Sequence, residues 1–343
     1  MNLYFIKSQD FNDFVKSLVG SKKVIGPKAK KHKFVFDRIE LPEDLRLDYD
    51  TTILPPKKEF FPTTQKLVEF KGNHYNGCIN PEEKILFGVH FYDVKAIDMT
   101  DHLFREKNED WNYLANREAT TIVASNVQTV SNRAFYGSVG TEVKPKGHDA
   151  YLTKLKDGYL YEAITNKGEA LVKFGKFDKG TDSHRKEAEE INNAVLKKCP
   201  ESLKYGTKEI ADKVRKSFDK KEVWENAAHD CFSCGSCNVV CPTCYCFDVQ
   251  DDWNLDQTSG LRSRYWDACL TEDFSKISLG AGATENFREH SADRFRHRIM
   301  RKATYLNEKL GGPACVGCGR CSSACTADIA DPTKVINKIM ELR

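Results

Sequence analysis

The sequence predicts an α+β protein with a mixed α/β half followed by a helical half. Three observations lead to this class. The chain has 343 residues, a length typical of about two domains. Strand-like and helix-like segments alternate over residues 1–205, the first predicted domain. Eleven of the thirteen cysteines lie between Cys231 and Cys325, within the second predicted domain, residues 206–343.

Three segments of the first domain are rich in β-branched and aromatic residues, a composition that favours strands. These predicted strands are Lys33–Ile39, Lys84–Val89 and Thr120–Ala124. The N-terminal residues mix apolar and charged side chains and lack a small-residue cleavage site. We therefore expect an amphipathic first helix rather than a signal peptide.

The second predicted strand leads into a helix for which Asp93 is the expected N-cap. In that helix Val94, Ile97 and Leu103 recur at roughly helical spacing. The loop before it would lie at the carboxyl end of a strand, where α/β domains commonly bind ligands. A simple crossover connection is the alternative.

Several other segments have clear boundaries. Residues 183–199 predict a polar helix that Pro200 ends, and the proline-bounded residues 54–62 predict a connection. The second domain is expected to be helical. Its helices are marked by Ile210, Val214 and Phe218, by Phe295, Ile299 and Leu306 before Gly311, and by Asp331 with Pro332 at the start of the last helix.

Composition excludes several classes of function. The 53 Lys and Arg residues nearly balance 50 Asp and Glu residues, so there is no concentrated basic face for nucleic acid. No apolar run approaches the roughly 18 residues of a membrane span. A large chain without a signal peptide is expected in the cytoplasm, where clustered cysteines bind metal rather than form disulfides.

Two runs of four cysteines share the spacing C-x2-C-x2-C-x3-C. Motif 1 comprises Cys231, Cys234, Cys237 and Cys241. Motif 2 comprises Cys315, Cys318, Cys321 and Cys325. This spacing is typical of [4Fe–4S] clusters, because three thiolates line one tight loop and the fourth points to the other cluster. Structural zinc sites use paired knuckles or Cys and His with one ion per four ligands, so zinc fits less well.

The spacing therefore predicts two [4Fe–4S] clusters with exchanged ligands. One cluster would take Cys231, Cys234, Cys237 and Cys325, and the other would take Cys315, Cys318, Cys321 and Cys241. The 73 residues between the motifs, 242 to 314, are far more than a small ferredoxin has. We expect a helical two-cluster ferredoxin-like domain, in which Gly235, Gly317 and Gly319 bring backbone N–H groups close to the clusters.

Three further cysteines, Cys244, Cys246 and Cys269, lie between the motifs. A third metal site built from them would need a fourth ligand that the sequence does not identify. The simpler interpretation is that they pack around the clusters and lower the local dielectric.

The segment between the motifs is also rich in basic residues. They are Arg262, Arg264, Arg288, Arg294, Arg296, Arg298, Arg301 and Lys302. Three interpretations stay open: a docking surface for an acidic partner, charge compensation for anionic clusters, and a solvated helix face with intrachain pairs. No phosphate-binding loop, Cys-Cys-Gly motif or acid–base constellation occurs, and the glycines near Gly280 do not complete a dinucleotide fingerprint.

Four segments together resemble one family of iron–sulfur subunits. They are CFSCGSCNVVCPTCYCFDV (231–249), RYWDAC (264–269), NFREH (286–290) and CVGCGRCSSAC (315–325). LPPKKEFFP and FGVHFYDVKAID extend the likeness upstream. The family contains the iron–sulfur subunit of anaerobic sulfite reductase and the β subunit of cytosolic NiFe sulfhydrogenases. Relatives read Arg-Pro-Cys-Asp where this chain has His90 to Asp93, so no role of a cysteine there transfers.

The resemblance implies an electron-transfer subunit. It would sit between a flavin- and [2Fe–2S]-containing subunit that oxidises NAD(P)H and a catalytic subunit that reduces sulfite or turns over hydrogen. The eight motif cysteines correspond one by one to the family's cluster ligands, and Cys244, Cys246 and Cys269 match family cysteines without a settled role. The first domain would supply docking surface.

Two other classes of function remain. A stand-alone iron–sulfur oxidoreductase would need a substrate or flavin pocket in the first domain. A binding protein with purely structural clusters would need affinity for nucleic acid, which the near-neutral charge disfavours.

Overall fold

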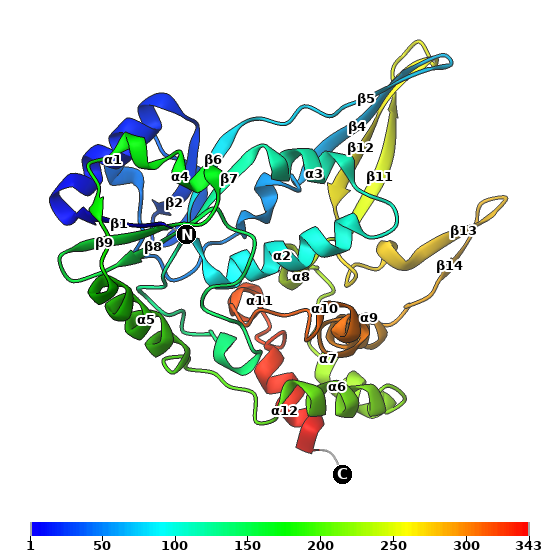
Figure 1. Cartoon of the computed structure of the whole chain (residues 1–343). Helices are drawn as coiled ribbons and strands as arrows, with labels where there is room; N and C mark the ends of the chain where they lie inside the picture. Colours follow the sequence, from blue (N-terminus) through cyan, green and yellow to red (C-terminus); the bar gives the residue numbers. More distant parts are fainter. Residues whose placement is uncertain (1, 342–343) are drawn as a thin grey trace.

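The computed structural model describes residues 2–341. Its N-terminal part is built on an eight-stranded mixed sheet with the order β10-β1-β9-β8-β7-β6-β2-β3 (Figure 1). The strands are β1 (Asn2–Lys7), β2 (Val24–Lys30), β3 (Lys33–Arg38), β6 (Lys84–His90), β7 (Thr120–Ser125), β8 (Ala150–Lys154), β9 (Gly158–Ala163) and β10 (Asp178–Lys179). Neighbours among β2, β6, β7 and β8 run parallel, and the other neighbours run antiparallel.

Helices cover both faces of this sheet because successive strand residues point to opposite sides. Ile85 and Phe87 of β6 share a core with α1 (Ser8–Ser21), whereas Leu86 shares a core with α2 (Phe91–Arg105). On the α2 side lie also α3 (Trp111–Glu118) and α5 (Asp182–Leu196). The short α4 (Asn166–Glu169) follows β9.

The three predicted strands are confirmed as β3, β6 and β7, and the polar helix is confirmed as α5. The predicted connection contains only a short 3-10 turn, Pro56–Glu59. Two local predictions were wrong. The chain opens with β1 before its first helix, since the apolar residues 3–6 fit a strand that pairs with β9 and β10. Asp93 lies in the first turn of α2, whose N-cap is His90, and its carboxylate is buried.

Helices dominate the C-terminal part, as expected. They are α6 (Thr207–Lys216), α7 (Lys221–Ala228), α8 (Ser236–Val239), α9 (Ser291–Met300), α10 (Asn307–Leu310), α11 (Arg320–Ala324) and α12 (Pro332–Glu341). Trp224, Phe295, Ile299, Val335 and Ile339 share their core. The predicted α6, α9 and α12 are confirmed, but Phe218 lies beyond the end of α6 and is partly exposed.

The segment between the motifs is not helical throughout, contrary to expectation. It forms two hairpins, β11 (Phe247–Trp253) with β12 (Ser259–Trp266), and β13 (Lys276–Gly280) with β14 (Ala283–Asn286). Aromatic and β-branched residues favour the first hairpin. Gly280, Ala281 and Gly282 all adopt positive φ and form the turn of the second.

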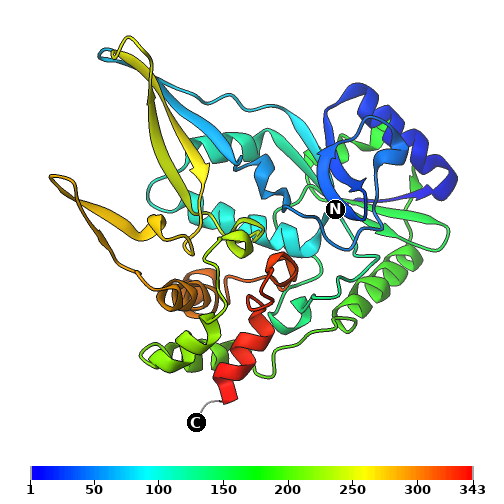
Figure 2. The ribbon, with the colours of Figure 1, turned by 180° about the vertical axis from the view of Figure 1, so that it is seen from behind.

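The first hairpin continues a sheet that begins in the N-terminal part. β12 pairs with β4 (Thr64–Lys71), which pairs with β5 (His74–Gly77), so the sheet order is β11-β12-β4-β5. This sheet projects from the body of the molecule in both views (Figures 1 and 2). The mixture of helices and strands confirms the α+β class. This sheet takes strands from both predicted domains, and the boundary at residue 205 stays a prediction. No helix within residues 2–341 is both long and apolar enough to cross a membrane.

Candidate metal centre

The backbones of the two motifs repeat the same conformation. Gly235 and Gly319, each directly after the second cysteine, have φ of 72° and 78°. Ser233 and Gly317, each directly before it, have φ of 54° and 68°. After the glycine each motif continues into a short helix, α8 (Ser236–Val239) in motif 1 and α11 (Arg320–Ala324) in motif 2. These two helices pack against each other (Figure 1). The shared spacing therefore produces two equivalent loops that face each other.

The thiols of the two motifs interleave at this contact. Burial raises the pKa of Cys237 to about 12, and the neighbouring thiolates that add to the shift are Cys321 and Cys325 of motif 2 and Cys231 of motif 1. Burial likewise raises the pKa of Cys315 to about 12, with Cys321 and Cys241 adding to it. The fourth cysteine of each motif thus lies within electrostatic reach of cysteines of the other motif.

The remaining thiols complete this distribution. Burial raises the pKa of Cys318, and Cys241 and Cys321 are among the charges that affect it. Cys234 is exposed, and its contact is with the Ser236 hydroxyl at 3.3 Å, which lowers its pKa, rather than with another thiol. Seven of the eight motif cysteines are thus linked by electrostatic influence on one another, and Cys234 lies at the solvent side.

Motif 2 is held against the N-terminal part. The Arg320 guanidinium makes two hydrogen bonds of 2.6 Å to the carboxylate of Asp93, and it also reaches the Thr52 carbonyl at 2.9 Å. Both charged side chains are almost fully buried, at 2% and 0% exposure. The Phe135 N–H donates to the Gly317 carbonyl at 2.8 Å. A bidentate charged pair of this kind fixes orientation as well as distance.

Motif 1 is closer to solvent. Phe232 is 72% exposed, and Cys234 is exposed beside it. The neighbouring Ser233 accepts a hydrogen bond of 3.0 Å from Arg294, whose guanidinium also donates to the Arg288 carbonyl at 2.9 Å. Motif 1 is therefore supported by α9 and by the chain that leads into it.

Buried cations surround the thiols. Arg298 is 2% exposed, and within residues 2–341 its Nε and Nη1 have no hydrogen-bond partner. Burial would lower its pKa, but the thiolates of Cys237 and Cys321, among others, raise it. Lys302 is also buried and donates to Thr243 at 2.6 Å.

A third buried cation belongs to the N-terminal part. The Lys57 ammonium donates to the Cys241 carbonyl at 2.9 Å and to the Cys244 carbonyl. Buried charges require compensation, and a cubane with four thiolate ligands carries net negative charge. The orphaned nitrogens of Arg298 and the positive-φ loops therefore fit iron–sulfur clusters as the groups that this centre holds.

Two of the three other cysteines lie at one amide, and the third lies beside one of them. Asn238 Nδ2 lies 2.9 Å from the Cys269 sulfur and 3.8 Å from the Cys244 sulfur. The Cys246 thiol interacts with Cys269, which lowers the pKa of Cys246. Among residues 2–341, no three or more His, Cys, Asp and Glu side chains are arranged to hold a single metal ion. An iron count would decide whether these three cysteines bind a third metal site or pack around the clusters.

The basic residues between the motifs do not act as one surface. Arg264, Arg294, Arg298 and Lys302 are buried, while Arg262 pairs at the surface with Asp251 at 2.7 Å. Of the interpretations left open, charge compensation fits Arg298 and Lys302. Lys57 and the Asp93–Arg320 pair were missed by sequence reasoning, because their partners are more than 180 positions away in the chain.

Comparison with known proteins agrees with this centre. Residues 230–329 match the family model of a 4Fe-4S dicluster domain, and all eleven clustered cysteines fall in that range. The whole chain is similar to sulfhydrogenase 2 subunit beta of Pyrococcus furiosus, with 32% identity over 339 residues that cover 98% of each chain. The chain belongs to this family of iron–sulfur subunits. No solved structure matches the chain significantly.

Membership confirms the predicted resemblance and the presence of an iron–sulfur domain of the dicluster type. The match over almost the full length also means that the N-terminal part belongs to the family architecture. In the His90–Asp93 segment, the His90 ring stacks on Tyr49 with the ring centroids 3.8 Å apart, and Asp93 pairs with Arg320.

Proposed function

We propose that this chain is an electron-transfer subunit of a cytoplasmic multi-subunit oxidoreductase. Electrons would pass through two [4Fe–4S] clusters between a flavin/[2Fe–2S] subunit that oxidises NAD(P)H and a catalytic subunit. The single observation that supports the proposal is the packing of the two motif loops against each other through α8 and α11, which brings thiols of both motifs within electrostatic reach of one another. Interlocked ligands keep two clusters close together, as a relay requires.

The proposed ligand sets are those that the cysteine spacing predicts. Cluster 1 is assigned to Cys231, Cys234, Cys237 and Cys325. Cluster 2 is assigned to Cys315, Cys318, Cys321 and Cys241. When bound, the clusters supply one-electron redox chemistry. The chain's own part is to hold the thiolates, to exclude water from cluster 2, and to place the cations of Arg298, Lys302 and Lys57 beside them.

The catalytic partner is of the NiFe hydrogenase or the sulfite reductase type. The printed name of the Pyrococcus furiosus relative contains sulfhydrogenase, which favours the hydrogenase type. Parallel assays of hydrogen turnover and sulfite reduction by the purified complex discriminate between the two. A NiFe subunit or a sirohaem subunit encoded beside this chain would give the same answer.

Iron analysis tests the cofactor assignment. Chain purified without oxygen should contain about eight irons and eight sulfides. About four irons or fewer after full reconstitution, or stoichiometric zinc, would refute it. About twelve irons would instead place a third cluster at Cys244, Cys246 and Cys269.

Electron flow through the complex tests the relay. A complex carrying Cys318→Ser should lose NAD(P)H-linked turnover, while each partner keeps its half reaction with artificial dyes. Cys78→Ser, which changes a cysteine outside both motifs, is the matched control and should leave turnover intact. Unchanged turnover in Cys318→Ser would remove the clusters from the path.

The stand-alone oxidoreductase remains the alternative. It requires a pocket in the α/β part, and a cavity of about 790 Å³ exists there. The residues that line this cavity lie between positions 105 and 167, outside both cysteine motifs. Flavin absorbance in the purified chain, or sulfite reduction or hydrogen evolution by the chain alone, would favour the alternative.

A further inference from the structure

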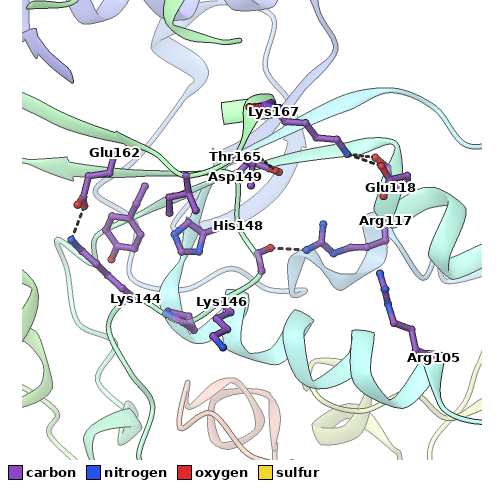
Figure 3. Close-up of a pocket in the computed structure, with 15 residues that line it drawn as sticks. Arg105, Arg117, Glu118, Lys144, Lys146, His148, Asp149, Glu162, Thr165 and Lys167 are labelled. Atoms are coloured by element: carbon purple, nitrogen blue, oxygen red, sulfur yellow. Dashed lines mark hydrogen bonds and ion pairs between the residues drawn. The ribbon is translucent and has the colours of Figure 1, made fainter. Parts of the chain in front are cut away.

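The cavity of about 790 Å³ lies at the ends of the central strands of the eight-stranded sheet (Figure 3). Its lining residues lie outside both cysteine motifs in the sequence. It is bordered by the amino ends of β7 and β8, the carboxyl end of β9, and the last turns of α2 and α3. We call it the edge cavity, because it lies along the edge that the strand ends form. Its lining residues are Arg105, Arg117, Glu118, Lys144, Pro145, Lys146, Gly147, His148, Asp149, Tyr151, Glu162, Ile164, Thr165, Asn166 and Lys167.

The carboxylates of the edge cavity already have partners. Glu162 pairs with Lys144 at 2.7 Å, and Glu118 pairs with Lys167 at 3.5 Å (Figure 3). Asp149 accepts hydrogen bonds from the Ile122 N–H at 2.8 Å and from the Thr165 hydroxyl at 2.6 Å. The negative charge of the lining is thus paired within the protein, with Glu162 held by its ion pair and not by a hydrogen bond.

Positive charge is in excess, because five cations line the cavity against three carboxylates. Arg117 is held by Asp101 at 3.0 Å and by the Gly147 carbonyl at 2.6 Å. The side chains of Arg105 and Lys146 are exposed at the rim. Within the described residues neither side chain makes an ion pair or a hydrogen bond. These two cations are available to a ligand.

His148 is an independent sign of a missing partner. Its imidazole lies in the cavity wall and is 7% exposed (Figure 3). Neither ring nitrogen has a hydrogen-bond partner within residues 2–341. Burial lowers the pKa of the imidazole to about 4, whereas Asp149 and the Pro145 backbone act to raise it. At least one buried nitrogen is therefore left without a partner, although buried polar groups in native structures are nearly always bonded.

We propose that the edge cavity binds a small organic anion that carries phosphate or carboxylate groups. Its volume falls within the roughly 300–1,000 Å³ of small-molecule sites. Arg105 and Lys146 bind the anionic group, and the neutral imidazole of His148 offers one donor and one acceptor to the ligand. Tyr151 and Ile164 face its organic part. This site is independent of the clusters and of the electron-relay function.

Calorimetric titration of the intact, anaerobically purified chain tests the proposal. The probes are ADP, citrate and uncharged adenosine. ADP or citrate should bind in a saturable one-to-one manner, and comparison of the two shows whether the site prefers phosphate or carboxylate. Adenosine should bind at least about tenfold more weakly than ADP, since it lacks the charged hydrogen bonds.

Two variants locate the binding. Arg105→Ser with Lys146→Ser removes the two rim cations, and it should weaken binding of the better probe about tenfold or more. His148→Gln should weaken it by a similar factor while the iron content stays unchanged. Lys16→Ser with Lys208→Ser removes two exposed cations outside the cavity and is the control, with an expected change below about twofold.

Three results would overturn the proposal. The first is no saturable binding of ADP or citrate to the wild-type chain. The second is equal binding of adenosine and ADP. The third is equal weakening by the rim variant and by its control, because that would show non-specific attraction to a positively charged surface.

Discussion

The two cysteine motifs have one spacing and one backbone conformation, yet they lie in different surroundings. In motif 1 Phe232 is 72% exposed and Cys234 is exposed, whereas the equivalent Val316 and Cys318 of motif 2 are 2% and 7% exposed. Motif 2 is covered by the N-terminal part, which contacts it through Asp93. The two motifs therefore share a local conformation, and tertiary packing determines which of them reaches solvent.

This difference in exposure indicates which of the two proposed clusters an external partner can approach directly. Cluster 1, at the exposed Cys234, is the one that an external redox partner can approach. Motif 2, the proposed site of cluster 2, lies between the C-terminal helices and the α/β part, and the Asp93–Arg320 pair anchors it. A partner of cluster 2 has to bind across the N-terminal part.

The exchange of fourth ligands is the strongest test of the comparison. Cys241→Ala should abolish cluster 2 and leave cluster 1, and Cys325→Ala should do the reverse, with loss of about four irons in each case. Electron paramagnetic resonance of the reduced proteins identifies the surviving cluster. Cys318→Ala and Cys231→Ala serve as references for chains without cluster 2 and without cluster 1. If Cys241→Ala gave the spectrum of Cys231→Ala, each motif would hold its own cluster.

The buried pair that anchors motif 2 should contribute far more to the free energy of unfolding than the exposed pair on the β11–β12 hairpin. Asp93→Ala leaves the buried Arg320 charge uncompensated, so the free energy of unfolding should fall by about 3–5 kcal/mol. The matched control is Asp251→Ala, which breaks the exposed pair with Arg262 and should cost less than about 1 kcal/mol. Denaturant unfolding under anaerobic conditions measures both. Equal losses would mean that Asp93 does not anchor motif 2.

Much of this arrangement could be predicted from the sequence. Periodicity located α5, α6, α9 and α12, and β-branched composition located β3, β6 and β7, because local patterns dominate those segments. The cysteine spacing indicated dicluster chemistry, which the family match bears out. The exchange of ligands was also inferred from spacing, and it stays a prediction.

Other features depend on contacts that no local pattern encodes. The hairpin β11–β12 is stabilised by pairing with β4, almost 200 residues earlier, so its strand character could not be separated from its helical surroundings. Asp93 has the sequence context of an N-cap, but a distant arginine determines its role. Lys57 carries no sequence signal, since its partners are backbone carbonyls of a remote loop.

A residue swap tests whether the two loops are equivalent. Gly317→Ser should lower the free energy of unfolding by more than about 2 kcal/mol, because its φ is 68° and a Cβ there would lie 2.5 Å from the Tyr136 backbone. Ser233→Gly should change it by less than about 1 kcal/mol. It relieves a serine from φ of 54° but loses the hydrogen bond from Arg294. Similar effects of the two substitutions would show that packing around the loops is the same.

Arg298 and Lys57 test which cations act on which cluster. Arg298 lies within reach of Cys237, a cluster 1 ligand, and of Cys321, a cluster 2 ligand. Lys57 is bonded to the carbonyl of Cys241, a ligand of cluster 2 alone. Loss of a positive charge disfavours the added electron, so substitution should make the reduction potential more negative.

Arg298→Gln should therefore lower both potentials, and Lys57→Gln should lower that of cluster 2 only. A shift of about 60 mV corresponds to about 1.4 kcal/mol for a one-electron couple, which is within the range of one charge at close range. The measurement is a redox titration followed by electron paramagnetic resonance at pH 7, below the pKa of about 8 to which burial lowers Lys57, so that the lysine is charged. Arg262→Gln, at the surface, should leave both potentials unchanged. If Arg298→Gln moved one potential alone, the guanidinium would serve a single cluster, and the two motifs would differ in electrostatics as well as in exposure.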